Sequence, residues 1–271
     1  MPGYGSLVPR YGRARRDSSL AVLEGLHPLK HALRFGADIL DVACLDRDRL
    51  ALLCSELAPD VSEQILDRAQ LVPAEIFAQL APLPPPTGVI AIAERPTVDT
   101  SAALADPRPA PIVLLEDPRD LGNVGACIRV AAAADAQAVF SIGGHDPWHP
   151  DALRGSAGLH YAVPVAPIGE SAGQALAETA EHDRPLLVLD PAGEQLDPQA
   201  LPPRAILAFG TERHGLSAEL LSRADARLAI PMRPKVSSLN LATSVAAVLF
   251  AWRLSGLGSG RQPQPSSQTS F

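Results

Sequence analysis

Polar side chains follow two apolar runs of this chain, at points where a buried strand would end. Asn123 and Arg129 come after the run Ile112 to Leu115, within an Ala-rich stretch, and Glu212 follows Ala205 to Phe209 in the sequence Gly-Thr-Glu-Arg-His-Gly. An arginine inside an otherwise apolar helix needs an acidic partner or an anionic ligand. A Gly-rich loop lets the backbone approach a ligand closely and can direct a carboxylate inward. A rim arginine paired with an acid, and an ordinary Gly-rich turn, remain the alternatives.

A third polar group stands at the start of an apolar stretch near the C-terminus. Leu228 to Ile230 is a short apolar strand that a proline ends. Ser237 and Ser238 are good N-cap residues, and Leu239 to Trp252 predicts a helix that is buried on most sides. Asn240 would lie in its first turn, at the positive end of the helix dipole. Capping alone is the alternative role for these polar residues.

The elements between these groups are typical of a buried parallel sheet with helices. Ligands of open α/β sheets bind beyond the carboxyl ends of the strands, where the polar loops lie. Neither GxGxxG nor GxxxxGK[ST] occurs, which excludes the usual dinucleotide and P-loop sites. Strands are predicted at 112–115, 138–142, 186–189 and 205–209, and helices at 124–134, 171–181 and 217–222.

The chain before this region divides into further parts. Residues 1–17 hold four arginines among glycines and prolines and predict a flexible basic arm that binds phosphates, with a solvated tail as the alternative. Residues 18–105 alternate helix and strand, which predicts a small α/β domain. A Pro-rich linker spans 94–111, and we place the domain boundary near Asp106, so that 106–255 form the second domain. Residues 256–271 are mostly Gly, Ser, Gln and Pro and predict a disordered tail.

Composition narrows the class of protein. The chain has 271 residues, 46% of them hydrophobic, so a sizeable core is possible. No apolar run reaches the roughly 18 residues of a membrane span, and the N-terminal residues do not predict a signal peptide. Three distant cysteines and the absence of a metal-ligand spacing predict a cytoplasmic protein with reduced thiols and no metal site. The net charge of −7 argues weakly against a nucleic-acid partner, although the basic arm points the other way.

Three stretches, in this order and spacing, resemble the three motifs of the SpoU (TrmH-type) RNA 2′-O-ribose methyltransferases. The resemblance covers roughly Pro111 to Trp252. It implies a parallel α/β domain with a deep trefoil knot, S-adenosylmethionine as the methyl donor, and a homodimer. The matching residues are Asn123, Gly125 and Arg129 for the first motif, Gly210, Glu212 and Gly215 for the second, and Ile230-Pro231-Met232 with Ser238-Leu239-Asn240 for the third.

The resemblance also implies roles for single residues. Arg129 matches the arginine proposed to activate the ribose hydroxyl, either as a general base with a lowered pKa or as a cation that binds phosphate and stabilises the developing alkoxide. The polar shell around it would be Asn123, Glu212, Ser238 and Asn240. The donor-binding residues would be Phe209, Gly210, Ile230, Met232, Ser238 and Leu239.

The N-terminal part, with Glu24-Gly25 just before a helix and Gly88-Val-Ile-Ala-Ile at its end, is similar to the ribosomal-protein-like RNA-binding domain that many family members carry. On this ground we expect rRNA, and 23S rRNA in particular, rather than tRNA as the substrate. The alternatives are a tRNA 2′-O-methyltransferase of the same family and a catalytically inactive RNA-binding or assembly protein. We expect the homodimer to use the last helix, through Val245, Val248, Leu249 and Trp252. The expected RNA contacts are Arg10, Arg13, Arg15 and Arg16 of the arm, and Arg154 in the sequence Arg-Gly-Ser-Ala-Gly, for which a plain turn is the alternative.

Overall fold

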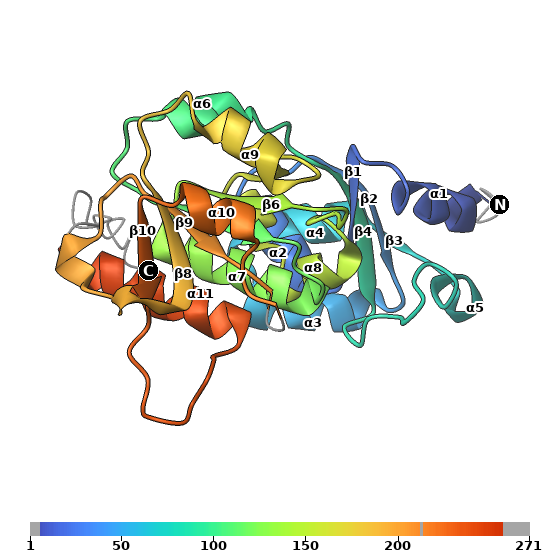
Figure 1. Cartoon of the computed structure of the whole chain (residues 1–271). Helices are drawn as coiled ribbons and strands as arrows, with labels where there is room; N and C mark the ends of the chain where they lie inside the picture. Colours follow the sequence, from blue (N-terminus) through green and yellow to red (C-terminus); the bar gives the residue numbers. More distant parts are fainter. Residues whose placement is uncertain (1–5, 212–213, 257–271) are drawn as a thin grey trace.

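The computed structural model describes residues 6–211 and 214–256 (Figure 1). Two sheets organise the chain, one in each of the two predicted domains. The predicted disordered tail after residue 256 lies outside the described residues, and so does Glu212. Within the described part, no helix is both long and apolar enough to cross a membrane.

The N-terminal unit contains a four-stranded sheet in the order β1-β4-β2-β3. β4 is antiparallel to both β1 and β2, whereas β3 is parallel to β2. The alternation of helix and strand that the sequence predicts is confirmed. The strands are β1 Leu20–Glu24, β2 Ile39–Cys44, β3 Ala69–Leu71 and β4 Val89–Glu94, and the helices are α2 Leu26–Arg34, α3 Arg47–Leu57, α4 Ser62–Arg68 and α5 Ala74–Phe77.

The prediction of a flexible N-terminal arm is wrong for the part of it that the structure describes. Residues Leu7–Ala14 form helix α1, and Leu7, Tyr11 and Ala14 are buried in a core that also includes Phe77 of α5. The Tyr11 hydroxyl donates to the carbonyl of Ile90 in β4 at 3.2 Å. Three apolar side chains at helical spacing therefore fasten this segment to the sheet, although glycines and arginines surround them in the sequence.

The second unit contains six parallel strands in the order β10-β8-β9-β5-β6-β7. The parallel α/β sheet predicted from the apolar runs is confirmed. All residues of β5, β6 and β9 are buried, as expected for strands covered on both faces. The strands are β5 Ile112–Glu116, β6 Ala138–Ile142, β7 Val165–Pro167, β8 Leu186–Gln195, β9 Ile206–Phe209 and β10 Ala226–Ala229.

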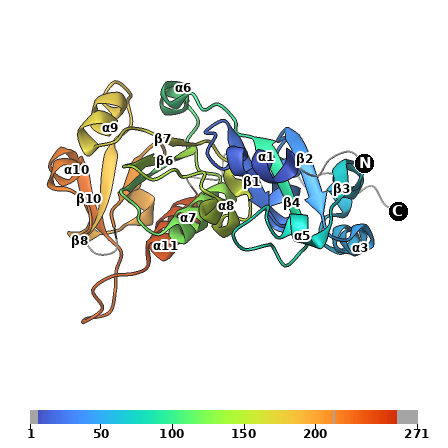
Figure 2. The same cartoon turned by 90° about the vertical axis from the view of Figure 1, so that its right-hand side faces the viewer.

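Helices cover both faces of this sheet, as Figures 1 and 2 show. One core lies between the sheet and the helices α6 Thr100–Ala105, α9 Ala172–Thr179 and α10 Ala218–Arg223. The opposite core lies under α7 Leu121–Ala134, α8 Pro150–Gly155 and α11 Leu241–Leu254, and it continues into the N-terminal unit through Leu23, Leu26 and Leu29. Ala103 and Leu104 of α6 belong to the first of these cores, so this helix of the predicted linker packs on the second sheet.

Two helices begin at other residues than the sequence predicted. Asn240, and not Ser237 or Ser238, caps α11, because its side-chain oxygen accepts from the backbone N–H groups of Ala242 and Thr243 at 2.9 and 3.3 Å. Helix α7 begins at Leu121 and not at Val124, because Asp120 caps it by accepting from the N–H of Asn123 at 3.0 Å. Several polar residues in a row can serve as caps, and sequence alone does not decide among them.

Candidate functional site

The loop after β9 closes on itself at the carboxyl end of the sheet. Thr211 and Gly215 exchange two backbone hydrogen bonds of 3.1 and 2.9 Å, and the Thr211 hydroxyl accepts from the N–H of His214 at 3.1 Å. A Cβ on Gly210 would lie 2.1 Å from the carbonyl carbon of Gly215, and Gly215 itself has φ +65°. Only glycine fits the first position without opening the loop. At the base of the loop, Gly210 and Gly215 therefore present only backbone atoms.

A cavity of about 460 Å³, here called the Gly210 cavity, lies between this loop, the end of β8 and the segment that leads to α11. Its volume falls within the range of small-molecule sites. The structure brings the six predicted donor-binding residues together in its wall. These are Phe209, Gly210, Ile230, Met232, Ser238 and Leu239.

The Gly210 cavity has a further wall that was not predicted from the sequence. Leu189, Asp190 and Pro191 of β8, the neighbour of β9 in the sheet, also line it. Asp190 is half-buried and accepts from the backbone N–H of Ala192 at 2.9 Å. The strand at 186–189 was predicted, but its place next to β9, which brings its carboxyl end to the cavity, is set by the tertiary fold.

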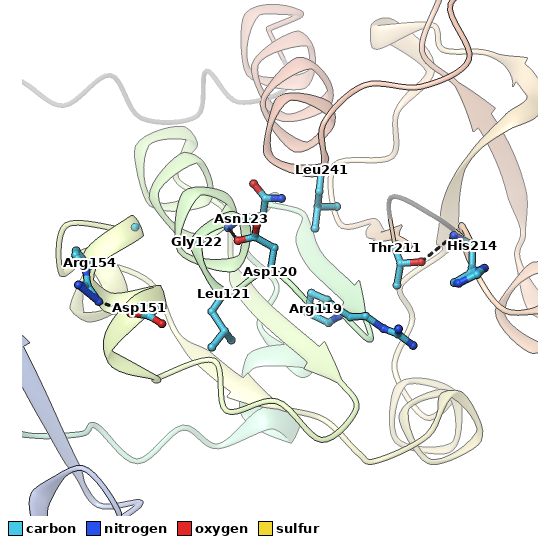
Figure 3. Close-up of a pocket in the computed structure, with 12 residues that line it drawn as sticks. Arg119, Asp120, Leu121, Gly122, Asn123, Asp151, Arg154, Thr211, His214 and Leu241 are labelled. Carbon is cyan, nitrogen blue, oxygen red and sulfur yellow. Dashed lines mark hydrogen bonds and ion pairs between the residues drawn. The ribbon is translucent and has the colours of Figure 1, made fainter. Parts of the chain in front are cut away.

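A second, larger cavity of about 930 Å³, here called the Arg154 cavity, adjoins the first (Figure 3). Thr211, His214 and Leu241 line both cavities, so the two meet at these residues. Figure 3 shows Arg154 with Asp151 at one end and Arg119 near His214 at the other. Two bound molecules could therefore lie next to each other, one in each cavity.

Asn123 lines the Arg154 cavity at the start of α7, close to Asn240 at the start of α11. The Nδ2 of Asn240 donates to the Oδ1 of Asn123 at 3.1 Å. Two of the predicted catalytic residues are thus in direct contact beside the junction of the cavities. Ser238 lies in the wall of the Gly210 cavity, and Glu212 belongs to the short gap outside the described residues.

Arg129 is exposed on α7 and lines neither of these two cavities within the described chain. The expectation of a charge inside an apolar helix is therefore wrong, because α7 keeps a solvent-facing stripe that includes Gly122, Arg129 and Ala133. Arg129 lies near the N-terminal unit. The pKa of His27 in α2 is lowered by partial burial, by Lys30 and by the positive charge of Arg129.

The arginines of the predicted arm are only partly available to a ligand. Arg15 donates to Glu24 and to the carbonyl of Leu80, both at 2.7 Å. Arg10 pairs with Asp41 at 2.7 Å. These two predicted RNA contacts hold α1 on its sheet, whereas Arg13 and Arg16 are exposed.

Close packing connects the Arg154 cavity to the N-terminal unit. A Cβ on Gly125 of α7 would lie 2.1 Å from the carbonyl oxygen of Ala152 in α8, so the second residue of the first motif serves helix packing. A Cβ on Gly158 would lie 2.6 Å from the Cα of Pro28 in α2. Figure 2 shows α8 between α7 and β1. The N-terminal unit therefore rests on the helix that carries Arg154.

Comparison with known proteins shows the family and the fold of this chain. The profile of the SpoU rRNA Methylase family matches residues 110–250. An uncharacterised tRNA/rRNA methyltransferase of Synechocystis is 28% identical over 249 residues, which span 89% of this chain and 86% of the relative. A 23S rRNA (adenosine(1067)-2′-O)-methyltransferase of Streptomyces laurentii is 26% identical over 84% of this chain and 83% of its own. The AdoMet-bound rRNA methyltransferase of Sinorhizobium meliloti has the same fold, with a TM-score of 0.73, 23% identity, and coverage of 93% of this chain and 94% of that one.

Proposed function

This chain belongs to the SpoU rRNA Methylase family, and we propose that it methylates a ribose 2′-hydroxyl of rRNA with S-adenosylmethionine as the donor. The observation that carries the proposal is the pair of adjoining cavities that meet at Thr211, His214 and Leu241. A group-transfer enzyme must hold donor and acceptor next to each other in a productive orientation. The Gly210 cavity takes the donor and the Arg154 cavity takes the acceptor nucleotide.

The residues of the Gly210 cavity fit the donor chemically. Leu189, Leu228 and Leu239 offer apolar side chains to a purine, and the backbone of Gly210 in the same wall offers hydrogen-bonding groups. Ser238 and Asp190 supply polar groups for the sugar and the amino-acid part. When bound, S-adenosylmethionine supplies a methyl group that its positive sulfur makes electrophilic. The family membership and the AdoMet-bound rRNA methyltransferase of the same fold support this choice of donor.

The acceptor hydroxyl has to be held in line with the methyl group and has to lose its proton. The amides of Asn123 and Asn240, fixed by their mutual hydrogen bond, would orient the hydroxyl at the junction of the cavities. An amide does not take up a proton at neutral pH. His214 lines both cavities and can accept or direct the proton, and Glu212, two residues earlier in the sequence, is the other candidate that the second motif implies.

Arg129 would complete the site in a dimer. Phe250 and Leu254 of α11 are exposed, at 38% and 83%, on the helix that packs beside α7. The four residues predicted to form the interface are instead buried within the chain: Val245, Val248, Leu249 and Trp252. We propose a homodimer that covers Phe250 and Leu254 and brings an acceptor site against Arg129. There the guanidinium acts either as base or as a fixed cation.

The resemblance to the family also suggests a knotted backbone and an RNA-binding role for the N-terminal unit. We propose that the segment between β8 and α11 forms the deep trefoil knot implied by the three motifs. We also propose that the N-terminal unit binds RNA beside the acceptor site, which its contacts with Arg154 and Ala157 support. The 23S rRNA enzyme of Streptomyces laurentii, similar over 84% of this chain, supports rRNA as the substrate.

The experiment that tests the function compares ribose methylation in RNA from a deletion strain and from the same strain complemented with the wild-type gene. Mass spectrometry of nuclease fragments maps 2′-O-methylated positions in rRNA and tRNA separately. We expect one rRNA position to lose its methyl group and to regain it on complementation. A change confined to tRNA would make the tRNA enzyme the correct function. No change in either RNA would leave an inactive RNA-binding protein.

A further inference from the structure

We propose that Glu24, a residue of the N-terminal unit, is a positioning residue that holds Arg154 in the wall of the acceptor cavity. The inference rests on the proposed function, because it takes the Arg154 cavity as the site of the RNA nucleotide. Glu24 ends β1, and its side chain is only 4% exposed. Its two carboxylate oxygens face two different arginines, so the residue joins the two units of the chain.

The geometry assigns different tasks to the two oxygens of Glu24. Oε1 accepts from Nη1 of Arg15 at 2.7 Å, and Arg15 also donates to the carbonyl of Leu80 at 2.7 Å, which anchors this side within the N-terminal unit. Oε2 lies 3.5 Å from Nη1 of Arg154 in α8. A carboxylate that is itself buried and held by a second arginine is a fixed point, unlike a mobile surface acid.

Arg154 has a second partner that is easier to displace. Its Nη2 contacts Asp151 in the same helix, and this side chain is 54% exposed (Figure 3). Exposed ion pairs contribute little, because both ions remain hydrated. An RNA phosphate that enters the cavity would replace Asp151 and form the bidentate contact that a guanidinium prefers. Glu24 would keep the arginine in place during this exchange.

The N-terminal unit also contacts the backbone that follows Arg154. The Nδ1 of His31 in α2 donates to the carbonyl of Ala157 at 2.7 Å, and Ala157 has φ +54°, an uncommon conformation for alanine. On the other side of α8, a Cβ on Gly155 would lie 2.8 Å from the carbonyl of Gly122, which also lines the cavity. The N-terminal unit thereby fixes the end of α8 against the cavity wall, and Glu24 fixes the side chain.

The test uses Glu24→Gln in the whole protein, because a positioning role and a simple charge effect predict opposite changes in RNA affinity. Removal of a negative charge near an RNA site should strengthen binding if the charge acts only through its field. If Glu24 instead positions Arg154, the variant should weaken RNA binding by about tenfold, the loss expected for one charge-assisted contact. The salt dependence of binding should also fall by about one unit of slope.

A double-mutant cycle separates positioning from a general loss of structure. Glu24→Gln, Arg154→Gln and the double variant are compared by filter binding of labelled total rRNA, by KM and kcat for methyl transfer to the same RNA, and by melting temperature. We expect Glu24→Gln to raise KM while kcat and donor affinity stay unchanged, and to have no further effect once Arg154 is Gln. Additive effects of the two substitutions would overturn the proposal, as would tighter binding by Glu24→Gln.

Asp41→Asn is the matched control. Asp41 is also a carboxylate of the N-terminal sheet with an 8% exposed side chain, and it also pairs with an arginine of α1, but its partner is Arg10. This variant should leave KM unchanged, and a rise equal to that of Glu24→Gln would contradict the proposal. If Glu24→Gln does not fold, Glu24→Asp keeps a charge for Arg15 but shortens the reach towards Arg154, and it should raise KM only when Arg154 is present.

Filter binding distinguishes a failure of the positioning role of Glu24 from a failure of the proposed methyl transfer. If the wild-type protein binds rRNA but transfers no methyl group to RNA, the proposed reaction fails, while the binding cycle still decides the role of Glu24. If the wild-type protein binds no RNA at all, both proposals fall. If methyl transfer is intact and Glu24→Gln behaves like wild type, only the positioning role is wrong.

Discussion

The Nδ2 of Asn240 donates to the Oδ1 of Asn123 at 3.1 Å, although the two residues lie 117 positions apart. The same Asn240 caps α11 through its oxygen, which accepts from the N–H groups of Ala242 and Thr243. Because the backbone N–H groups can only donate, the amide must turn its oxygen to the helix and its nitrogen to Asn123. One side chain therefore fixes both the start of the last helix and the relative position of two motifs.

Replacement of Asn240 should separate these two tasks. Asn240→Asp keeps an excellent cap but places a carboxylate oxygen against the oxygen of Asn123, so we expect stability close to wild type and a large loss of methyl transfer. Asn240→Ala loses the cap as well and should lower the free energy of unfolding by about 1 kcal/mol. Urea unfolding and tritiated methyl transfer measure the two effects. Wild-type turnover in Asn240→Asp would show that the contact is not needed for the reaction.

Gly210 should tolerate no side chain, for a reason within its own loop. Since a Cβ there would lie 2.1 Å from the carbonyl carbon of Gly215, even Gly210→Ala has to open the loop. We expect a cost of about 1–3 kcal/mol in stability and a strong loss of S-adenosylmethionine binding in calorimetry. Gly144→Ala is the control, because a methyl group added there would meet no atom within 4 Å beyond its chain neighbours. Undiminished donor affinity in Gly210→Ala would remove this loop from the donor site.

His160 should make stability depend on pH in the acid range. The ring is fully buried, and desolvation lowers its pKa from 6.5 to about 4. Its Nε2 donates to the carbonyl of Pro147 at 2.8 Å, which leaves Nδ1 to accept from the Ser156 hydroxyl at 2.7 Å in the neutral form. Between these two pKa values the unfolded chain binds a proton that the folded chain does not. The free energy of unfolding therefore falls as pH falls from 6.5 towards 4, by up to about 3 kcal/mol.

Denaturant unfolding between about pH 7 and pH 4 checks the contribution of His160. His160→Asn should flatten the pH dependence, whatever it does to stability at neutral pH. The exposed His145→Asn should keep the wild-type slope. A slope that persists in His160→Asn would mean that other groups, and not this buried ring, govern acid stability.

The second sheet could be predicted from the sequence, because its strands are short apolar runs followed by turn residues. Ala138–Ile142 is buried throughout and was predicted with its observed limits. The donor-binding residues were also predicted together, through the resemblance of the motifs. The wall formed by Leu189 and Asp190 was not, since it depends on β8 lying next to β9 in the sheet, and strand order is a property of the tertiary fold.

Other predictions failed because tertiary contacts decided the outcome. Tyr11 turned a basic segment into a docked helix, because one large buried side chain outweighs the glycines and arginines around it. Arg129 was placed inside a buried helix because the alanines of α7 look apolar, yet small residues occupy solvent-facing positions without cost. The ion pairs of Arg154 with Glu24 and of Arg10 with Asp41 join distant segments, and no sequence spacing announces them.

Replacement of Arg129 should affect turnover but neither stability nor donor binding. Because its side chain is exposed, Arg129→Ala should change the free energy of unfolding by no more than about 0.5 kcal/mol. It should also leave donor binding in the Gly210 cavity intact, since Arg129 is not among the residues that line it. Turnover should fall on the order of 10²-fold or more, the effect of a lost acid–base or charge-stabilising group.

Two further substitutions test the guanidinium of Arg129 and its dependence on the proposed homodimer. Arg129→Lys should not restore turnover, because a point charge does not reproduce the planar fork of the guanidinium. If a second copy completes the site, Leu254→Glu on the exposed end of α11 should yield a monomer in light scattering and lower turnover without affecting donor binding. Methyl transfer at the wild-type rate by Arg129→Ala would exclude the arginine from the mechanism. The proton would then have to pass to another group at the junction of the cavities, and His214, which lines both of them, would be the first to replace.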